Sequence, residues 1–481
     1  MSLVRKAVKG SLWMAVLNYS NYGLLFLCNI VLARLLTPDD FGVMALALSM
    51  ADIVFMLAGF GFSMACIQLQ ELDDVFETGL TLTLVAGLTI FLVGLVAAWG
   101  ASWSYPAPVA TFLAVLSVMA GLKVPTTVFM ARIEKDFAFA TSALVRFLTA
   151  ILGMGLGLTL AYLGWGAWSL LAREVAATVA LFAGAVLLSP LRFRPRFNPA
   201  TARRLLRFCF GMLGMRISEV FYNKGFNLAM GTLAGTSVFG LYDRAHYVAT
   251  FPNTAMAQFH AKVTFTILSR IKNDLARSGE AADVVLWLLA RLTLPVGLMV
   301  FIFPREIITL ILGGQWLEAA GMFRGLALFM VVQPLYSSTK HILLSQGAPR
   351  SVTISRVAAL GVVLSMVFAV RALRADWAWA AWGVSLANLV SLLILVAALR
   401  SRGVIIHWRR ILATPCVLCV ALGMAVVLAR GHTHYLVCIA LSALAWCLAS
   451  AVLEREQYLG LWSRLRGKSG APAAPRDGEA Q

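Results

Sequence analysis

Long apolar stretches, separated by short polar segments, run along almost the whole chain. A helix needs about 20 mostly apolar residues, at roughly 1.5 Å of rise each, to cross the hydrocarbon layer of a bilayer. By this criterion the pattern predicts an all-α integral membrane protein with about fourteen transmembrane helices. They are expected near residues 10–34, 42–66, 78–100, 107–131, 141–162, 164–189, 208–233, 238–266, 284–304, 318–342, 352–371, 377–399, 411–429 and 434–453.

The chain repeats part of its own pattern at an offset of 198 residues. The repeat aligns Arg5-Lys6-x-x-Lys9 with Arg203-Arg204-x-x-Arg207, Phe41-Gly42 with Phe239-Gly240, and Asn29 with Asn227. Six predicted spans separate the copies, so both have the same orientation, as in transporters built from parallel repeats. The hinges at 37–41 and 235–239 are therefore expected on one face of the membrane, at one end of a central cavity.

The repeat predicts how the chain is divided. Residues 1–196 are expected to form an N-terminal lobe of six helices, and residues 197–403 a C-terminal lobe of six. Two extra helices are expected in residues 404–460. The tail at 461–481 is rich in Gly, Ala, Pro and charged residues, which predicts a disordered segment.

Composition agrees with a membrane protein and excludes a nucleic-acid-binding one. Hydrophobic residues make up 60% of the 481 and charged residues only 13%, with a mean hydropathy of +0.83. A soluble domain is much less apolar. The net charge is +18, but the Lys and Arg residues cluster between apolar runs and form no continuous basic face with interleaved aromatics.

The basic residues also predict orientation, because cytoplasmic loops are rich in Lys and Arg. With both termini in the cytoplasm, most loop Lys and Arg, Arg356 included, fall on the cytoplasmic side. The residues expected on the opposite side are Arg34, Arg305, Arg371, Arg374 and Arg430. The apolar run after Arg5-Lys6 is too long for a signal peptide and lacks a cleavage site, so it is predicted to be the first span.

Charged residues inside the predicted spans are the candidates for a functional site, because charge at membrane depth is costly and faces a bundle interior or a watery cavity. The basic ones are Lys123, Arg146, Arg173, Arg216, Lys224, Arg244, Lys262, Arg291, Arg324 and Lys340, and the acidic ones are Asp52, Glu174, Glu219 and Asp243. The excess of positive charge suits an anionic ligand. Alternatively, Lys123, Arg146, Lys262, Arg291 and Lys340 lie near span ends, where their long stems can reach the interface.

The seventh span has the clearest polar pattern. Its residues Arg216, Glu219, Asn223 and Asn227 recur at helical spacing, which predicts one polar face bordered by Lys224. The repeated copy in the first span has Asn18, Asn21 and Asn29 at the same register. We expect these two faces to meet across the cavity as a substrate-binding surface. The alternative is that Arg216 and Glu219 only neutralise each other.

Four further residues are candidates. Arg173 and Arg244 are expected to bind substrate, and Asp52 and Asp243 to bind or exchange a coupling ion. Asp52 could equally be the counter-ion of a nearby basic residue.

Several segments resemble a known family. These segments are Lys9-Gly10-Ser11-Leu12-Trp13, Leu32-Ala33-Arg34-Leu35-Leu36-Thr37-Pro38-Asp39-Asp40-Phe41-Gly42, Phe239-Gly240-Leu241-Tyr242-Asp243-Arg244-Ala245 and Leu312-Gly313-Gly314-Gln315-Trp316. Together they resemble the polysaccharide-transporter family of Wzx-like flippases, which belongs to the multidrug/oligosaccharidyl-lipid/polysaccharide (MOP) superfamily. The resemblance covers residues 1–460.

The resemblance implies two six-helix lobes, two extra helices and alternating access in the bacterial inner membrane. The implied substrate is an undecaprenyl-diphosphate-linked oligosaccharide for exopolysaccharide, capsule or lipopolysaccharide O-antigen synthesis. A polysaccharide polymerase and chain-length machinery are implied as partners.

No catalytic, cofactor or metal motif stands out, so an enzyme is not expected. Gly467-Lys468-Ser469 lacks the first Gly of a phosphate-binding loop, and the histidines show no metal-ligand spacing. The competing functions are a peptidoglycan-precursor flippase, a multidrug exporter, and a membrane-embedded glycosyltransferase or polymerase. The positive sign of the cavity argues against a cation-drug exporter, and the parallel repeat argues against the transferase or polymerase.

The distribution of Lys and Arg predicts that reporter proteins fused after Gln481 and after Gly100 report opposite sides of the membrane. A reporter active only in the periplasm should be silent after Gln481 and active after Gly100. Activity of both fusions on the same side would contradict the predicted topology.

Overall fold

The computed structural model describes residues 3–454 except 60–61, 63–64, 67–71, 136–138, 192–195, 270–274 and 430–434. Within these residues it is helical and contains no strand. The first helices are α1 (Leu3–Leu35), α2 (Pro38–Gly59), α4 (Leu72–Ala101), α5 (Ala107–Lys135), α6 (Phe139–Tyr162) and α7 (Ala167–Leu188). Next come α8 (Pro199–Val220), the π-helix η1 (Phe221–Gly225), α9 (Phe226–Ala234), α10 (Thr236–Ser269), α11 (Leu275–Ile302), α12 (Pro304–Ile311), the 3₁₀ helix η2 (Gly314–Ala319), α13 (Ala320–Gly325), α14 (Ala327–Ser345), α15 (Pro349–Ala372), α16 (Ala378–Arg400), α17 (Trp408–Ala429) and α18 (Tyr435–Leu453).

Many of these helices can cross a bilayer. Among the described residues, seven are long and apolar enough to do so, and a pair bent by 50°, Gly314–Gly325 with Ala327–Ser345, meets the same criterion together. The predicted all-α membrane fold is therefore confirmed, whereas the number of fourteen spans stays a prediction. Within the span predicted at 318–342 the structure has a bend: α13 ends at Gly325, α14 begins at Ala327, and the two parts of the pair are inclined by 50°.

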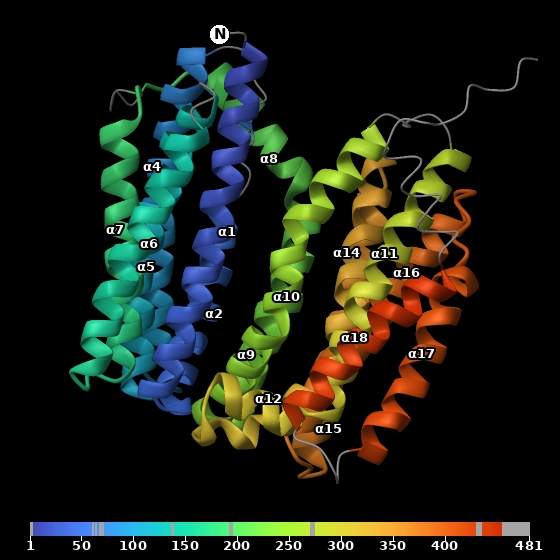
Figure 1. Cartoon of the computed structure of the whole chain (residues 1–481). Coiled ribbons are helices and arrows are strands. Elements are labelled where there is room, and N and C mark those ends of the chain that lie inside the picture. Colours follow the sequence, from blue (N-terminus) through green and yellow to red (C-terminus); the bar gives the residue numbers. More distant parts are fainter. Residues whose placement is uncertain are drawn as a thin grey trace, which may run out of the picture.

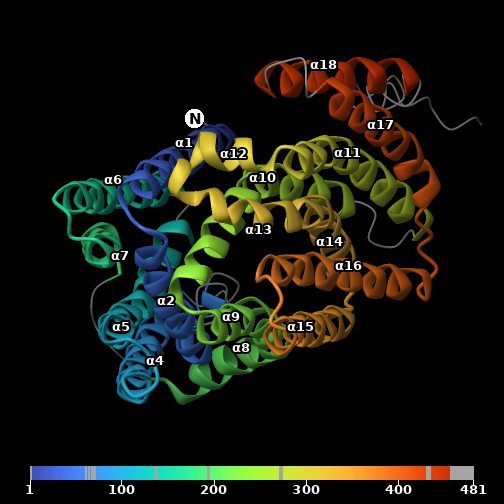
Figure 2. The same cartoon turned by 90° about the horizontal axis from the view of Figure 1, so that it is seen from below.

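The helices form two groups that meet at one end and diverge toward the other (Figure 1). The first group contains α1, α2 and α4–α7, and the second contains η1 and α9–α18, with α8 between the groups. We call the end with the start of α1 the open end, and the end with α9 and α12 the closed end. Viewed from below, α9 and α10 lie beside α2, where the groups meet (Figure 2).

Burial follows the same division. The largest apolar core contains Phe41 and Phe112 from the first group together with Phe239 and Trp316, so both groups contribute to it. Toward the open end each group has a core of its own, one around Phe76 in α4 and α5 and the other in α11, α14 and α16. The shared core is therefore what holds the groups together at the closed end.

The groups approach most closely where α2 crosses α10. A Cβ atom at Gly42 would lie 1.8 Å from the carbonyl oxygen of Thr236, and one at Gly240 would lie 1.8 Å from that of Pro38. Any side chain there would overlap backbone, so only glycine permits the crossing. The two contacts are equivalent under the 198-residue offset, which relates 38 to 236 and 42 to 240. The crossing is thus reciprocal, like a contact around a twofold axis.

The predicted hinges meet directly at this crossing. Oγ1 of Thr236 donates a 2.5 Å hydrogen bond to Oδ1 of Asp39, at the first turns of the two helices. Gly235, with φ 90°, turns the chain from α9 into α10, and few other residues adopt that conformation without strain.

A second contact between the groups closes the end of α1. The last carbonyl groups of a helix have no partner within it. Here Nε2 of Gln315 and Nε1 of Trp316 donate to the carbonyl oxygen of Ala33 at 2.5 and 2.7 Å. In return, Nη2 of Arg34 donates to the carbonyl oxygen of Leu310 at 2.9 Å. The segments 32–42 and 312–316, which prompted the family resemblance, are therefore in contact with each other.

Arg291 in α11 connects this helix to α17 and α18. It forms a buried ion pair with Glu454, directly after α18, and the two side chains are 3% and 2% exposed. Nη1 of Arg291 also donates to the carbonyl oxygens of Trp287 and Ile411, at 3.0 and 2.9 Å. The expectation that Arg291 reaches the membrane interface is wrong, because these acceptors satisfy the guanidinium inside the protein.

The crossing predicts that Gly240→Ala separates α2 from α10, because the added Cβ atom would overlap the carbonyl oxygen of Pro38. The separation can be measured in a protein lacking native cysteines, with Pro38→Cys and Thr236→Cys and a cross-linker of about 10 Å, the spacing of packed helices. Cross-linking should fall severalfold in Gly240→Ala. The matched control is Gly361→Ala, where nothing lies within 4 Å of the added Cβ atom. Equal cross-linking in both would contradict the role of the glycine.

Candidate functional site

Two arginines, one from each helix group, meet on a single asparagine. Nη1 of Arg173 in α7 and Nη1 of Arg244 in α10 each donate to Oδ1 of Asn29 in α1, both at 3.3 Å. Asn29 is 8% exposed, and its Nδ2 donates to the carbonyl oxygen of Leu25 at 2.7 Å, which fixes the direction of Oδ1. The structure thus brings together Arg173 and Arg244, and we call them, with Asn29, the arginine cluster.

The arginine cluster has more positive than negative charge. Nη2 and Nε of Arg244 lie 2.5 and 3.0 Å from Oδ2 of Asp243, and its guanidinium lies 4.2 Å from the ring centre of Phe41. Asp243 is thereby the counter-ion of Arg244. Among the described residues, no carboxylate forms an ion pair with Arg173. Its neighbour Glu174 instead pairs with Nζ of Lys123 at 2.6 Å.

The polar face predicted for the seventh span is divided in two. At 3.6 residues per turn, Glu219, Asn223 and Asn227 would share one face. The wider turn of η1, at Phe221–Gly225, shifts the later residues around the helix. Glu219 accepts from Nζ of Lys340 in α14 at 2.9 Å, whereas Asn227 donates to Oγ of Ser49 in α2 at 3.0 Å. The prediction of a single face is therefore wrong, because sequence spacing does not reveal a π-helix.

Asp52 is an ion-pair partner across the two groups. Its Oδ2 lies 2.7 Å from Nζ of Lys224, which joins α2 to η1. The side chains remain 45% and 30% exposed, so this pair lies beside open space even though it connects the groups. Of the two roles open for Asp52, the structure provides the counter-ion.

Several other expected residues differ from the predictions. Lys123 and Lys340, for which the membrane interface was the alternative location, pair with Glu174 and Glu219. Oδ1 of Asn21 is buried and has no hydrogen-bond partner among the described residues. The side chains of Asn18, Arg216 and Lys262 lie outside the described part of the structure.

Sequence reasoning missed one charged residue at the core of the second group. Arg356 in α15 was assigned to a cytoplasmic segment, yet it is only 2% exposed. Its guanidinium lies 3.9 Å from the ring centre of Tyr336 and 4.5 Å from that of Tyr222, and Nη1 donates to Oδ1 of Asn388 at 3.3 Å. The available signal was its position inside the apolar run 352–371.

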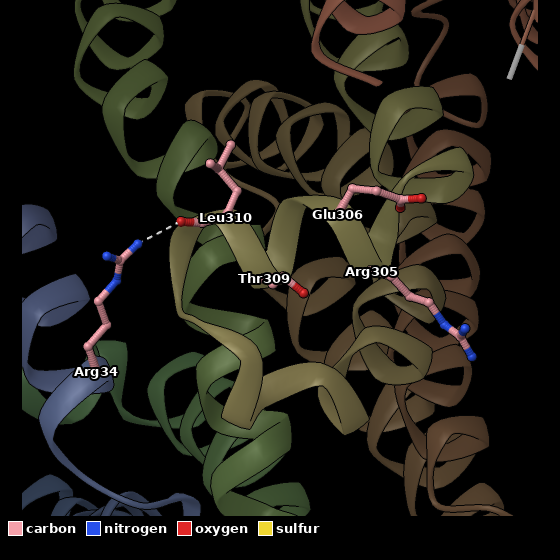
Figure 3. A pocket seen from close by; sticks show the side chains of 5 residues that line it. All are labelled: Arg34, Arg305, Glu306, Thr309 and Leu310. Atoms are coloured by element: carbon pink, nitrogen blue, oxygen red, sulfur yellow. Dashed lines mark hydrogen bonds between the residues drawn. The ribbon is translucent and has the colours of Figure 1, made fainter. Parts of the chain in front are cut away.

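The side chains that line a hollow at the closed end do not point toward a common centre. It measures about 510 Å³ and is lined by Arg34, Arg305, Glu306, Thr309 and Leu310. Figure 3 shows Arg34 directed to the carbonyl oxygen of Leu310 while Arg305 points away on the other side of α12. Among the described residues, no group of three or more His, Cys, Asp or Glu is placed to hold a metal ion.

Comparison with known sequences gives one family and several relatives. Residues 31–321 match the model of the family described as polysaccharide biosynthesis protein. The chain is 26% identical over 316 residues to the succinoglycan biosynthesis transport protein ExoT of Rhizobium meliloti (strain 1021), covering 64% of this chain and 63% of that one. It is 22% identical over 327 residues to the lipopolysaccharide biosynthesis protein WzxC of Escherichia coli (strain K12), covering 66% and 65%. The matches span slightly less than two thirds of these relatives' own length.

Solved structures share the fold. The lipid II flippase MurJ in an inward closed conformation superposes with a TM-score of 0.74 at 11% identity, over 92% of this chain and 99% of that one. An inward-facing multidrug resistance MATE family transporter of the MOP superfamily superposes with a TM-score of 0.59 at 17% identity, over 81% and 98%. At these identities the likeness establishes the fold, and it confirms the predicted fold class.

The ion pair across the groups predicts the effect of reversing its charges. Asp52→Lys places two positive charges together and should lower the melting temperature of the purified protein by about 2 °C, as expected for a partly exposed pair. Adding Lys224→Asp recreates the pair in reverse and should restore most of the loss. A double variant no more stable than Asp52→Lys alone would contradict the pairing.

Proposed function

The chain belongs to the polysaccharide biosynthesis protein family, and from this premise we propose that it is a flippase for a lipid-linked oligosaccharide. The membership confirms the family resemblance predicted from the sequence. The chain is a multi-pass membrane protein of the transporter type and not an enzyme. In this proposal it moves an oligosaccharide repeat unit on undecaprenyl diphosphate across the bacterial inner membrane, for exopolysaccharide, capsule or O-antigen synthesis.

The arginine cluster is the observation on which this proposal rests. A diphosphate has several oxygen acceptors, and arginine binds such groups with two parallel hydrogen bonds. Arg173 and Arg244 come from different helix groups and share one neutral acceptor, and among the described residues Asp243 is the one carboxylate that forms an ion pair with either of them. A diphosphate between them would replace the weak 3.3 Å contacts to Asn29 with charge-assisted ones.

Alternating access would proceed by rocking of the two groups, which correspond to the proposed lobes 1–196 and 197–403, with α17 and α18 attached to the second. With both termini in the cytoplasm, the open end faces the cytoplasm and the closed end faces the periplasm. The head group would enter between the diverging groups and reach the arginine cluster, four residues beyond Gly240 on α10. Separation of α2 from α10 would then release it on the other side.

The relatives favour a polysaccharide precursor over the competing substrates. Both sequence relatives named above belong to polysaccharide synthesis or transport by their names, whereas the lipid II flippase and the multidrug transporter resemble this chain in fold alone. A cationic drug would also be repelled by the excess positive charge of the arginine cluster.

The proposal predicts that Arg173→Gln and Arg244→Gln each lower polymer export about 10- to 100-fold, the worth of one hydrogen bond to a charged group. Export is measured as secreted or surface polysaccharide, and protein abundance is measured in isolated membranes. Lipid-linked repeat units should accumulate on the cytoplasmic leaflet at the same time.

The control variant is Arg146→Gln. The side chain of Arg146 in α6 is 48% exposed, and its Nη2 makes a long ion-pair contact of 3.5 Å with Oε1 of Glu134. It should leave export unchanged. Normal export by the Arg173→Gln, Arg244→Gln double variant at normal abundance would refute the proposed function of the cluster.

A further inference from the structure

The second helix group contains a polar pocket on the other side of α10. It measures about 380 Å³ and is lined by residues of η1, α10 and α14. Its lining residue His246 follows Arg244 by two positions, so the two side chains point about 200° apart around the helix. The described residues that line it include no Asp, Glu, Lys or Arg. The pocket is therefore distinct from the arginine cluster and uncharged unless a histidine is protonated.

Its side chains can both donate and accept hydrogen bonds. Asn223, Asn253, Gln333 and Ser337 line it, and each has a donor as well as an acceptor. Nδ2 of Asn253 and Oε1 of Gln333 are buried and have no hydrogen-bond partner among the described residues. Because nearly all buried polar groups in folded proteins are bonded, this donor and this acceptor are available to a ligand.

A π-helix forms part of the pocket wall. The segment η1, a kind of helix frequent at functional sites, places Tyr222 and Asn223 in the lining. Pro334, which lies inside α14, lines the pocket as well.

Aromatic rings complete the lining. The rings of His246 and Phe329 lie 5.2 Å apart between centres and are tilted by 46°, and Tyr222 also lines the pocket. Ring faces are electron-rich and attract the C–H groups of a sugar ring. Amides, a hydroxyl and aromatic faces without a fixed charge match a neutral sugar. A cation would lack a carboxylate here, and an apolar ligand would leave Asn253 and Gln333 unbonded.

We propose that this pocket binds a neutral sugar residue of the translocated oligosaccharide, an assignment that rests on the flippase function proposed above. Its volume lies within the range of roughly 300–1,000 Å³ found for small-molecule sites. A chain of several sugar rings is long enough to pass around a helix about 10 Å wide. The diphosphate would then lie between the two groups and the sugar within the second group.

The test compares two ligands on the purified full-length protein. One probe is undecaprenyl diphosphate without sugar, and the other is the lipid-linked oligosaccharide extracted from the host strain. The wild-type protein should bind the second probe more tightly. In an Asn253→Leu, Gln333→Leu variant the affinity for the glycosylated probe should fall about tenfold, and that for the bare diphosphate should not change.

Two controls separate the pocket from general damage. Thr339→Val also removes a polar group from α14, but the Thr339 hydroxyl donates to the carbonyl oxygen of Leu335, so both affinities should stay at wild-type values. Unchanged binding of the bare diphosphate shows that a variant is folded. If the double variant fails this criterion, Ser337→Ala is measured in its place, with the same selective loss expected.

The outcomes distinguish the two proposals. A variant that keeps wild-type binding of the bare diphosphate but shows no weakening for the glycosylated probe would overturn the sugar pocket and leave the flippase proposal intact. Equal weakening for both probes in Ser337→Ala, measured after the double variant has failed the folding criterion, would overturn the pocket in the same way. A wild-type protein that binds neither probe would overturn the flippase proposal itself.

Discussion

The backbone contact between α2 and α10 is the constraint on which the rest of the architecture depends. Gly42 and Gly240 let the helices touch without side chains between them, and this fixes the point from which the groups diverge. The end of α1, two residues before α2, is held at the same place by Gln315 and Trp316. One turn beyond the crossing, Arg244 lies over the ring of Phe41, the neighbour of Gly42. The crossing thereby positions the arginine cluster.

The ion pairs formed by the acidic residues inside the spans explain which basic side chains keep an uncompensated positive charge. Each carboxylate predicted inside a span has a basic partner: Asp52 with Lys224, Glu174 with Lys123, Glu219 with Lys340, and Asp243 with Arg244. A buried charge without a partner or hydrogen bonds is costly, so these acids act as counter-ions. Among the described span residues, Arg173, Arg324 and Arg356 form no ion pair with a carboxylate, and of these Arg324 is exposed. Arg356 is enclosed by Tyr222 and Tyr336, whereas Arg173 lies at the junction of the groups.

The sequence was informative where a pattern reflects a simple period or a repeat. Apolar runs of helix length predicted the membrane fold, and the 198-residue repeat predicted that the hinges lie on one face of the membrane. It was uninformative where a partner comes from a distant helix. No spacing reveals that Lys340 reaches Glu219, 121 residues away, or that a π-helix turns Asn223 and Asn227 to different neighbours. Arg356 likewise has partners from other helices, Asn388 in α16 and the ring of Tyr222 in η1, which no spacing reveals.

The placement of the two proposed subsites bears on how one transporter accepts different sugars. A ligand biases a conformational equilibrium only by its differential affinity for the two states. The arginine cluster takes Arg173 and Asn29 from one group and Arg244 from the other, so its geometry changes when the groups rock. The polar pocket takes all its residues from η1, α10 and α14 and moves as one unit with the second group. In the proposed mechanism the diphosphate therefore drives the conformational change, whereas the sugar adds affinity in both states. Changes in sugar composition would then alter how tightly a substrate binds without altering the equilibrium between the two states.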